Sequence, residues 1–130
     1  MKIELKTNKR TELIDITSSI NSLIKENGME NGVCTVYIPH TTAGILVNEN
    51  YDPSVKHDIL NWLNSRVTEN GNYLHSEGNS DAHIKSMLLG NSMVLVIDDN
   101  KLLLGPWQGV LFAEFDGPRN REIWIKLSKS

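Results

Sequence analysis

The sequence predicts an α+β fold: a single compact domain of mostly antiparallel sheet, arranged as a meander or sandwich, with about three helices. Three observations predict it. Short segments rich in β-branched and apolar residues recur along the chain, as is typical of strands. Other segments place apolar residues at helical spacing and carry capping residues at their ends. In the last third, strand-like segments follow one another across tight turns, which indicates antiparallel pairing.

The first elements are an edge strand and an amphipathic helix. Residues 2–7 alternate between polar and apolar types, which predicts the strand. Apolar residues at helical spacing then predict a helix over residues 17–27. Either Asp15 or Thr17 can cap its start, and Gly28 suits the left-handed position after its end.

A buried strand and a second helix follow. Residues 32–38 are rich in β-branched and apolar types, and residues 45–47 are expected to continue the same sheet. Asp52 and Pro53 are typical of a helix start, with Asp at the cap and Pro in the first turn. The apolar stripe of this helix is expected to contain Val55, Ile59, Trp62, Leu63 and Arg66.

The second half predicts one more helix and four strands. Asn79 or Ser80 caps the helix, which ends near Leu89 with Gly90 behind it. The strands are predicted over residues 92–97, 101–104, 109–115 and 122–127, with turns at Asp99-Asn100 and Gly117-Pro118.

Composition excludes several classes of protein. A chain of 130 residues with 39% hydrophobic and 22% charged residues is an ordinary globular domain, here residues 1–130. The net charge of −3 comes without a basic stripe, so we expect no nucleic-acid partner.

The longest apolar run, 93–97, is far shorter than the roughly 20 residues of a membrane span, so we expect no membrane partner. The charged N-terminal segment lacks an apolar signal region, so we expect a cytoplasmic protein. Cys34 is the single cysteine and has no disulfide partner, and we expect it to be buried in a strand.

Side chains capable of chemistry gather in three stretches: residues 39–50, 75–83 and 114–121. Each stretch follows a strand or precedes a helix, which is where binding and catalytic sites are usually built.

Histidines are the most informative of these residues. His83 falls in the first turn of a helix, where the positive helix end favours the neutral imidazole that a metal ligand or a general base requires. With His40, His75 and nearby carboxylates it can form a three-ligand metal site with an open position. The alternative is that these histidines cap helices or line the core edge. His57 is expected to face solvent.

Several charged residues have two interpretations each. Asp58 is predicted to be half-buried on an apolar helix flank, where it needs a structural partner or belongs to a site. Arg119 and Arg121 can clamp a phosphate, or can solvate a hairpin and pair with Glu122. Lys85 is a further candidate anion contact.

Two other segments are ambiguous between site and structure. Asn48, Glu49 and Asn50 follow a strand, where they either point into a site or form a turn. Trp107 lies in a predicted bulge and suits the core, a subunit interface or stacking on a ring. The apolar residues 102–104 and 110–112 favour oligomerisation, because strands that are apolar on both sides need cover on both faces.

The polar motifs, taken together, resemble one known family. The motifs are His40-Thr41-Thr42-Ala43-Gly44, Asn48-Glu49, Asp52-Pro53, His75 to Gly78, Asp81-Ala82-His83-Ile84-Lys85, Leu88-Leu89-Gly90, Lys101-Leu102 to Gly105, Trp107-Gln108-Gly109 and Glu114-Phe115 followed by Gly117, Arg119 and Arg121. In this order they are similar to the YjbQ family, also called the secondary thiamine-phosphate synthase family. The resemblance runs over essentially the whole chain.

The resemblance implies a fold, an assembly and an activity. It implies a compact fold with an antiparallel sheet, a homotrimer, and weak thiamine-phosphate synthase activity, which joins hydroxymethylpyrimidine pyrophosphate to thiazole phosphate and releases pyrophosphate. The implied catalytic residues are His40, Asp58, His75, Glu77 and His83. The implied ligand-binding residues are Asn48, Glu49, Lys85, Trp107, Gln108, Arg119 and Arg121. Glu114 also matches the family motifs.

The reaction suggests a role for each type of residue. A divalent metal, zinc or magnesium, held by His40, His75 and His83, or else the side chains of Arg119, Arg121 or Lys85, would stabilise the departing pyrophosphate. Glu77 or Asp58 would stabilise the cationic pyrimidine, and Trp107 would stack on it. Two alternatives stay open: a metal-dependent hydrolase of a phosphorylated small molecule, and a non-catalytic trimeric ligand-binding protein.

Overall fold

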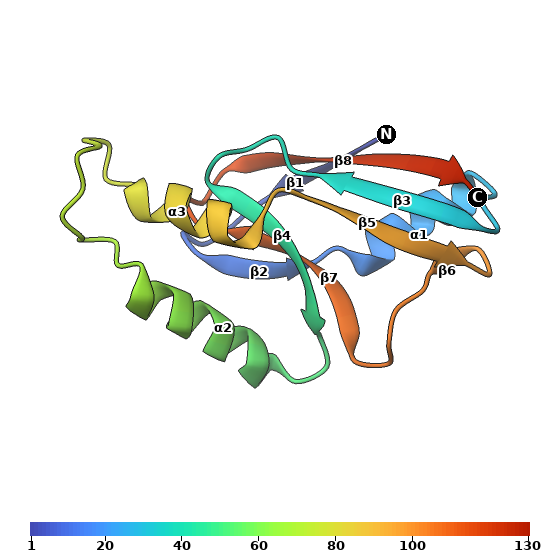
Figure 1. Ribbon diagram of the computed structural model, residues 1–130, viewed down its shortest axis with the longest axis horizontal. Coiled ribbons are helices and arrows are strands. Elements are labelled where there is room, and N and C mark those ends of the chain that lie inside the picture. The colour runs from blue at the N-terminus through green and yellow to red at the C-terminus, as the bar shows by residue number, and fades with distance from the viewer.

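Two antiparallel sheets and three helices make up the computed structural model, which describes residues 1–130 (Figure 1). In chain order the elements are β1 Lys2–Lys6, β2 Glu12–Asp15, α1 Thr17–Glu26, β3 Gly32–Tyr37, β4 Ala43–Glu49, α2 Pro53–Arg66, α3 Ser80–Leu89, β5 Ser92–Asp98, β6 Lys101–Leu102, β7 Gln108–Glu114 and β8 Asn120–Lys129. The predicted α+β fold with three helices is confirmed. None of the helices is both long and apolar enough to cross a membrane.

The strands divide between a larger and a smaller sheet. The five-stranded sheet has the order β1-β8-β3-β5-β6, which places β1 at an edge as predicted. The three-stranded sheet has the order β2-β7-β4. Residues 45–47 therefore do not continue the sheet of β3, because β4 pairs with β7 instead. The strand β2 was not predicted, since it has only four residues and only Leu13 is buried.

The segment after β7 connects the two sheets. Strand β7 lies in the smaller sheet and β8 in the larger one, so the Gly117-Pro118 turn is a crossing between sheets and not a hairpin. This corrects the prediction that Arg119 and Arg121 lie on a hairpin. It also makes the architecture a sandwich, the second of the two predicted arrangements.

The main core lies between the sheets. Cys34 and Val36 of β3 and Ile123 and Ile125 of β8 face it from the larger sheet. Val110 and Phe112 of β7 face it from the smaller sheet, and Ile20 and Ile24 of α1 fill the space at one end. Burial of Cys34 was predicted and is confirmed; it raises the pKa of this thiol to about 11.

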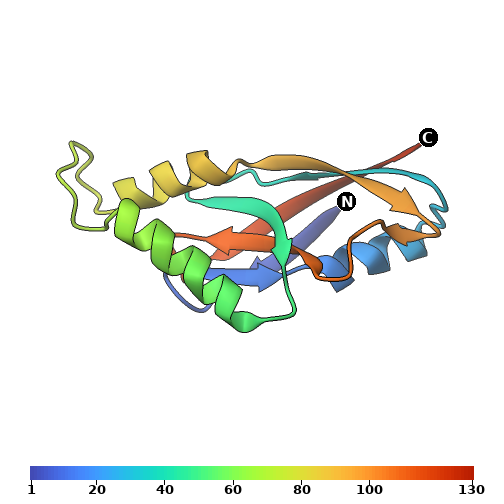
Figure 2. The ribbon, with the colours of Figure 1, turned by 60° about the horizontal axis from the view of Figure 1, so that its bottom comes forward.

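Helices α2 and α3 cover the other face of the smaller sheet. Both views place these two helices at one end of the molecule and α1 at the opposite end (Figures 1 and 2). Leu111 and Ala113 of β7 pack there with Leu63 of α2 and Ala82 of α3. The apolar residues 110–112 are thus covered on both sides by their own chain, so they give no argument for oligomerisation.

Most element boundaries follow local capping rules. Asp52 accepts a hydrogen bond from the backbone N–H of Ser54 at the start of α2, with Pro53 in the first position. Gly28 and Gly90 adopt positive φ at the ends of α1 and α3, as predicted. At the start of α1 the capping position is Ile16, although the side chain of Asp15 accepts from the Thr17 N–H.

Candidate functional site

A polar pocket of about 390 Å³ lies where the β3–β4 loop, the start of α3 and the β7–β8 loop meet. Its lining contains no hydrophobic residue. The lining residues are Pro39, His40, Thr41, Thr42, Glu77, Asn79, His83, Asp116, Arg119 and Arg121. His40 also borders two neighbouring hollows, one along β1 and β8 and one beside α3.

A buried ion pair between Arg121 and Glu114 lies beside the pocket, which Arg121 lines. Arg121 donates from Nε to both oxygens of Glu114 at 2.9 and 3.1 Å, and from Nη2 to the same carboxylate. Nη2 also donates to Thr42 Oγ1 at 2.8 Å, and Thr7 Oγ1 donates to Glu114 at 2.7 Å. Both residues are buried, and the Nε and Nη2 groups of Arg121 and the Glu114 carboxylate all have partners within the chain. Two of the three guanidinium nitrogens of Arg121 are thus used by the protein, while Arg121 and Arg119 both line the pocket; the predicted phosphate clamp stays a prediction.

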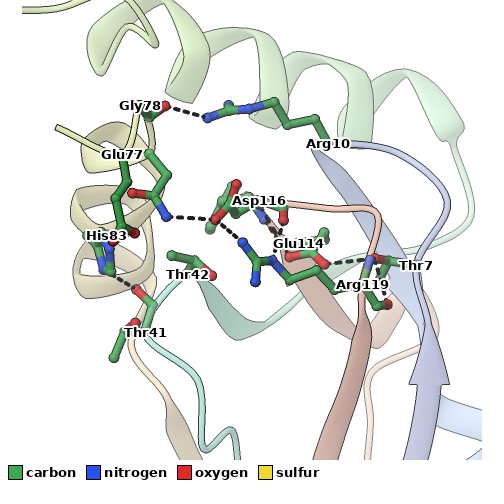
Figure 3. Close-up of polar contacts among 12 residues, drawn as sticks. Thr7, Arg10, Thr41, Thr42, Glu77, Gly78, His83, Glu114, Asp116 and Arg119 are labelled. Atoms are coloured by element: carbon green, nitrogen blue, oxygen red, sulfur yellow. Dashed lines mark hydrogen bonds and ion pairs between the residues drawn. The ribbon is translucent and has the colours of Figure 1, made fainter.

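His83 projects from the first turn of α3, as predicted. Its Nδ1 lies 3.1 Å from the backbone oxygen of Thr41 (Figure 3). A carbonyl oxygen only accepts, so Nδ1 carries the ring proton in this contact. In the neutral ring the other nitrogen, Nε2, is then the acceptor.

His40 is held by the protein through its acceptor nitrogen, whereas His83 is held through its donor nitrogen. Its Nε2 accepts a hydrogen bond of 2.9 Å from the backbone N–H of Glu122. A backbone amide only donates, so the proton of the neutral ring must lie on Nδ1. Burial, together with the positive charge of Arg121, lowers the pKa of His40. His40 therefore offers an N–H donor and not a lone pair.

His75 and Glu77 lie at the rim, in the loop before α3. The ring of His75 meets that of His83 edge to face, with centroids 5.5 Å apart. Its Nε2 lies 3.6 Å from Glu77 Oε2. These two predicted residues thus come close to His83, and both side chains are exposed to solvent.

Arg119 is anchored by a residue that the sequence did not single out. Asp116 accepts from Arg119 Nη2 at 2.7 Å through its carboxylate and from Arg119 Nε at 2.7 Å through its backbone oxygen. Asn79 Nδ2 donates to the same carboxylate at 2.8 Å, while Asn79 Oδ1 is buried without a donor. Asp116 and Asn79 both stand in the polar stretches, but nothing in the sequence indicates that their side chains meet.

Four predicted residues lie at the far end of the smaller sheet. Glu49 pairs with Gln108 there, whereas Ala43 pairs with Glu114 at the pocket end. Six residue steps of a strand span about 20 Å, so Asn48, Glu49, Trp107 and Gln108 are not brought together with the histidines. Trp107 instead packs edge to face on Tyr51 at 5.1 Å.

Lys85 and Asp58 also lie away from the pocket. Lys85 is buried and donates to Asp81 and to Asn64, each at 2.8 Å, on the side of α3 opposite His83. The Asp58 side chain is 79% exposed, and its carboxylate lies 3.5 Å from His57 Nδ1. The prediction that Asp58 is half-buried is wrong, because only Leu63 of α2 is buried. His57 faces solvent as predicted.

The predicted three-histidine metal site does not form within this chain. No group of three His, Cys, Asp or Glu side chains is arranged to hold a metal ion. The reason for His40 is chemical, since its Nε2 lone pair is used by Glu122 and its Nδ1 carries a proton.

Fold and pocket together define a small two-sheet α+β protein with a polar, histidine-bearing pocket at one end. Comparison with known families identifies it further. Residues 1–130 match the family described as UPF0047 protein YjbQ-like. The chain belongs to this family.

Relatives of known sequence and structure agree with this assignment. UPF0047 protein MJ1081 of Methanocaldococcus jannaschii is 58% identical over 126 residues, covering 97% of this chain and 91% of the relative. A solved structure of an uncharacterised conserved YjbQ/UPF0047 protein from Clostridium acetobutylicum is 46% identical, with a TM-score of 0.96 and coverage of 98% and 99%. A YbjQ-like protein of unknown function from Sulfolobus solfataricus is 29% identical, with a TM-score of 0.94 and coverage of 100% and 96%.

Proposed function

We propose that the polar pocket binds a phosphorylated small molecule and catalyses a group transfer of the thiamine-phosphate synthase type. The observation that carries the proposal is the meeting of Arg119 and His83 in one pocket. The volume of about 390 Å³ lies within the usual range for small-molecule sites.

Arg119 supports the phosphate part of the proposal. Its side chain is 51% exposed, and two hydrogen bonds to Asp116 hold the guanidinium in one orientation. The third nitrogen, Nη1, has no partner in the chain and can donate to a phosphate oxygen. A pre-oriented guanidinium loses less conformational freedom on binding than a free one.

The proposed reaction needs charge stabilisation and no net proton transfer. The C–O bond to pyrophosphate breaks, and its electron pair leaves with the pyrophosphate oxygen. The ring nitrogen of thiazole phosphate supplies the pair for the new C–N bond. Arg119 would stabilise the leaving pyrophosphate, and Glu77 at the rim would face the cationic methylene carbon. His83 would orient the pyrimidine by accepting a hydrogen bond from its amino group. Trp107 lies at the far end of the sheet within the chain, so the proposed step does not use it.

Turnover by site variants tests this function. The purified protein is given hydroxymethylpyrimidine pyrophosphate and thiazole phosphate, and released pyrophosphate is measured. We expect His83→Ala and Arg119→Ala to lower the rate at least tenfold, while Asp58→Ala, on the exposed side of α2, matches the parent. Equal rates for all variants would refute the assignment. Turnover of unrelated phosphoesters alone would favour the hydrolase.

We also propose that the protein is a homotrimer. One observation supports assembly: Tyr37, Val94, Val96 and Trp124 are all exposed and, by strand register, lie on the outer face of the larger sheet. An exposed apolar face of this kind is typical of an interaction surface.

A further inference from the structure

We infer that the pocket has a fixed polarity: His40 donates from Nδ1–H to an anionic, acceptor-bearing end of the ligand, while His83 Nε2 accepts from an N–H or O–H group at the other end. The inference rests on the proposed function for the identity of the ligand, and on hydrogen bonds for the polarity. It assigns His40 the role of a donor in place of the predicted metal ligand.

The donor side is built on the strands. The Glu122 N–H fills the Nε2 lone pair of His40, and no group in the chain accepts from Nδ1. Arg119, another pocket residue with a free donor, follows β7 in the same β7–β8 loop that leads to Glu122. Both groups donate, so an acceptor such as a phosphate or pyrophosphate oxygen fits this side.

The acceptor side is built on α3. The Nδ1–H of His83 faces the Thr41 oxygen, so in the neutral ring Nε2 is the acceptor (Figure 3). Asn79 stands at the capping position of α3, yet its side chain makes no capping hydrogen bond. Its Nδ2 donates to Asp116, which settles the orientation of the amide and leaves Oδ1 buried without a donor. His83 Nε2 and Asn79 Oδ1 are thus two acceptors without a donor at the start of α3, and a ligand with N–H or O–H groups would match them.

Together these groups select a class of ligand. The ligand carries a phosphate or pyrophosphate at one end and a group with exchangeable hydrogens, such as the amino group of an aminopyrimidine, at the other. A phosphorylated ligand without such a group would leave His83 and Asn79 unpaired in the bound state. An unpaired buried polar group costs more than the hydrogen bond contributes when made.

Nitrogen-15 NMR of the histidine rings tests the tautomers directly, without any ligand. We expect His40 and His83 both to be neutral with the proton on Nδ1 near neutral pH. His57, which is exposed and has no fixed partner other than Asp58, serves as the comparison. A proton on Nε2 of His40, or a charged His40 ring, would overturn the inference.

Two substitutions at His40 separate its donor role from its structural role. The side-chain nitrogen of asparagine can occupy the place of Nδ1, whereas the amide oxygen of glutamine can reach the place of Nε2 and accept from Glu122. With inorganic pyrophosphate as the probe in calorimetry, we expect His40→Gln to bind about tenfold more weakly and His40→Asn to retain most of the affinity. The reverse order, or no pyrophosphate binding by the parent protein, would overturn the inference.

A second probe tests the acceptor side. We expect His83→Ala to lower the affinity for hydroxymethylpyrimidine pyrophosphate at least fivefold more than the affinity for inorganic pyrophosphate. Equal losses for both probes would contradict the polarity. These binding results are independent of turnover. If the predicted binding pattern is found but the protein does not turn over, only the proposed reaction is refuted. If the protein turns over but the histidine tautomers are reversed, only the polarity is refuted.

Discussion

At the scale of single residues, one backbone N–H decides what His40 can do. A neutral histidine has one donor and one acceptor nitrogen. The nitrogen that the protein already uses determines which of the two roles is left for a ligand. The Glu122 N–H occupies Nε2, and Glu122 is 82 positions away in sequence. The chemistry of His40 is thus set by a strand that only the folded chain brings alongside it.

The Glu114–Arg121 pair predicts a large loss of stability when one partner is removed. Arg121→Ala leaves the buried Glu114 carboxylate without its counter-ion, so we expect the free energy of unfolding to fall by about 3–5 kcal/mol. Denaturant unfolding measures it. The matched control is Lys2→Ala, which removes an exposed ion pair with Glu122 and should have a much smaller effect. Similar losses in the two variants would show that the Arg121 pair is not effectively buried.

At the scale of elements, α3 separates two functions on two faces. His83 faces the pocket, while Asp81 and Lys85, four residues apart, face the interior. Arg10 donates to both oxygens of Asp81 at 3.1 and 3.2 Å. It also reaches the Gly78 oxygen at 3.5 Å (Figure 3). The buried network thereby holds the loop before α3, including Glu77, against the body of the protein.

The same network predicts a loss of stability in acid. Burial alone would raise the pKa of Asp81, but hydrogen bonds and charge from Arg10 and Lys85 outweigh it, so the pKa is lowered. The stabilisation is therefore complete above about pH 4, the ordinary pKa of aspartate, and is lost as pH falls through the lowered folded-state value. We expect Asp81→Asn to be less stable than the parent at pH 7, with the difference shrinking on acidification. Unfolding midpoints from pH 7 to pH 2 measure this, and a difference that stays constant across the range would contradict it.

Close packing of α3 on β4 gives a further prediction. A Cβ on Gly44 would lie 2.9 Å from the Gly90 backbone oxygen, which accepts from the Ile45 N–H. We expect Gly44→Ala to destabilise the protein by about 1–3 kcal/mol, because the helix end must move away from the strand. Thermal unfolding measures the loss. Gly28→Ala is a useful comparison, since its added Cβ meets no atom within 4 Å and any cost there comes from its positive φ. An unchanged melting temperature for Gly44→Ala would mean that α3 shifts at no cost.

At the scale of the whole molecule, the two sheets leave different faces open. The smaller sheet is covered by the core on one side and by α2 and α3 on the other. The larger sheet is covered only on its inner side, and its outer face exposes Val94 and Trp124. An interface between copies is therefore expected on the larger sheet and not on β7.

The mass in solution tests this expectation. Light scattering behind gel filtration should give about three times the chain mass of 14.6 kDa. Val94→Lys places a charge on the outer face of the larger sheet, so we expect it to shift the protein toward the monomer. Thr11→Lys, which lies beside α2 away from that face, is the matched control. A monomeric parent protein would refute the trimer.

The sequence by itself determined the features that depend on neighbouring residues. Asp52-Pro53, Gly28, Gly90 and the turn at Asp99-Asn100 act on the backbone within a few positions, so the helices and the β5–β6 turn could be located. The positive φ of Asp99 and Asn100 is an example of such a local choice. The family motifs likewise singled out His40, Glu77, His83 and Arg119, which all line the pocket.

Only the tertiary structure decided which strands pair and which side chains meet. β4 and β3 are both apolar strands, and nothing local separates the one that pairs with β7 from the one that pairs with β8. The same holds for Lys85 and Trp107, whose side chains suit a binding site. Lys85 is used by Asp81 in the protein interior, and Trp107 lies at the end of the smaller sheet away from the pocket. Strand partners and side-chain directions depend on contacts between residues far apart in the chain, and hydrogen-bond roles such as that of His40 depend on them in turn.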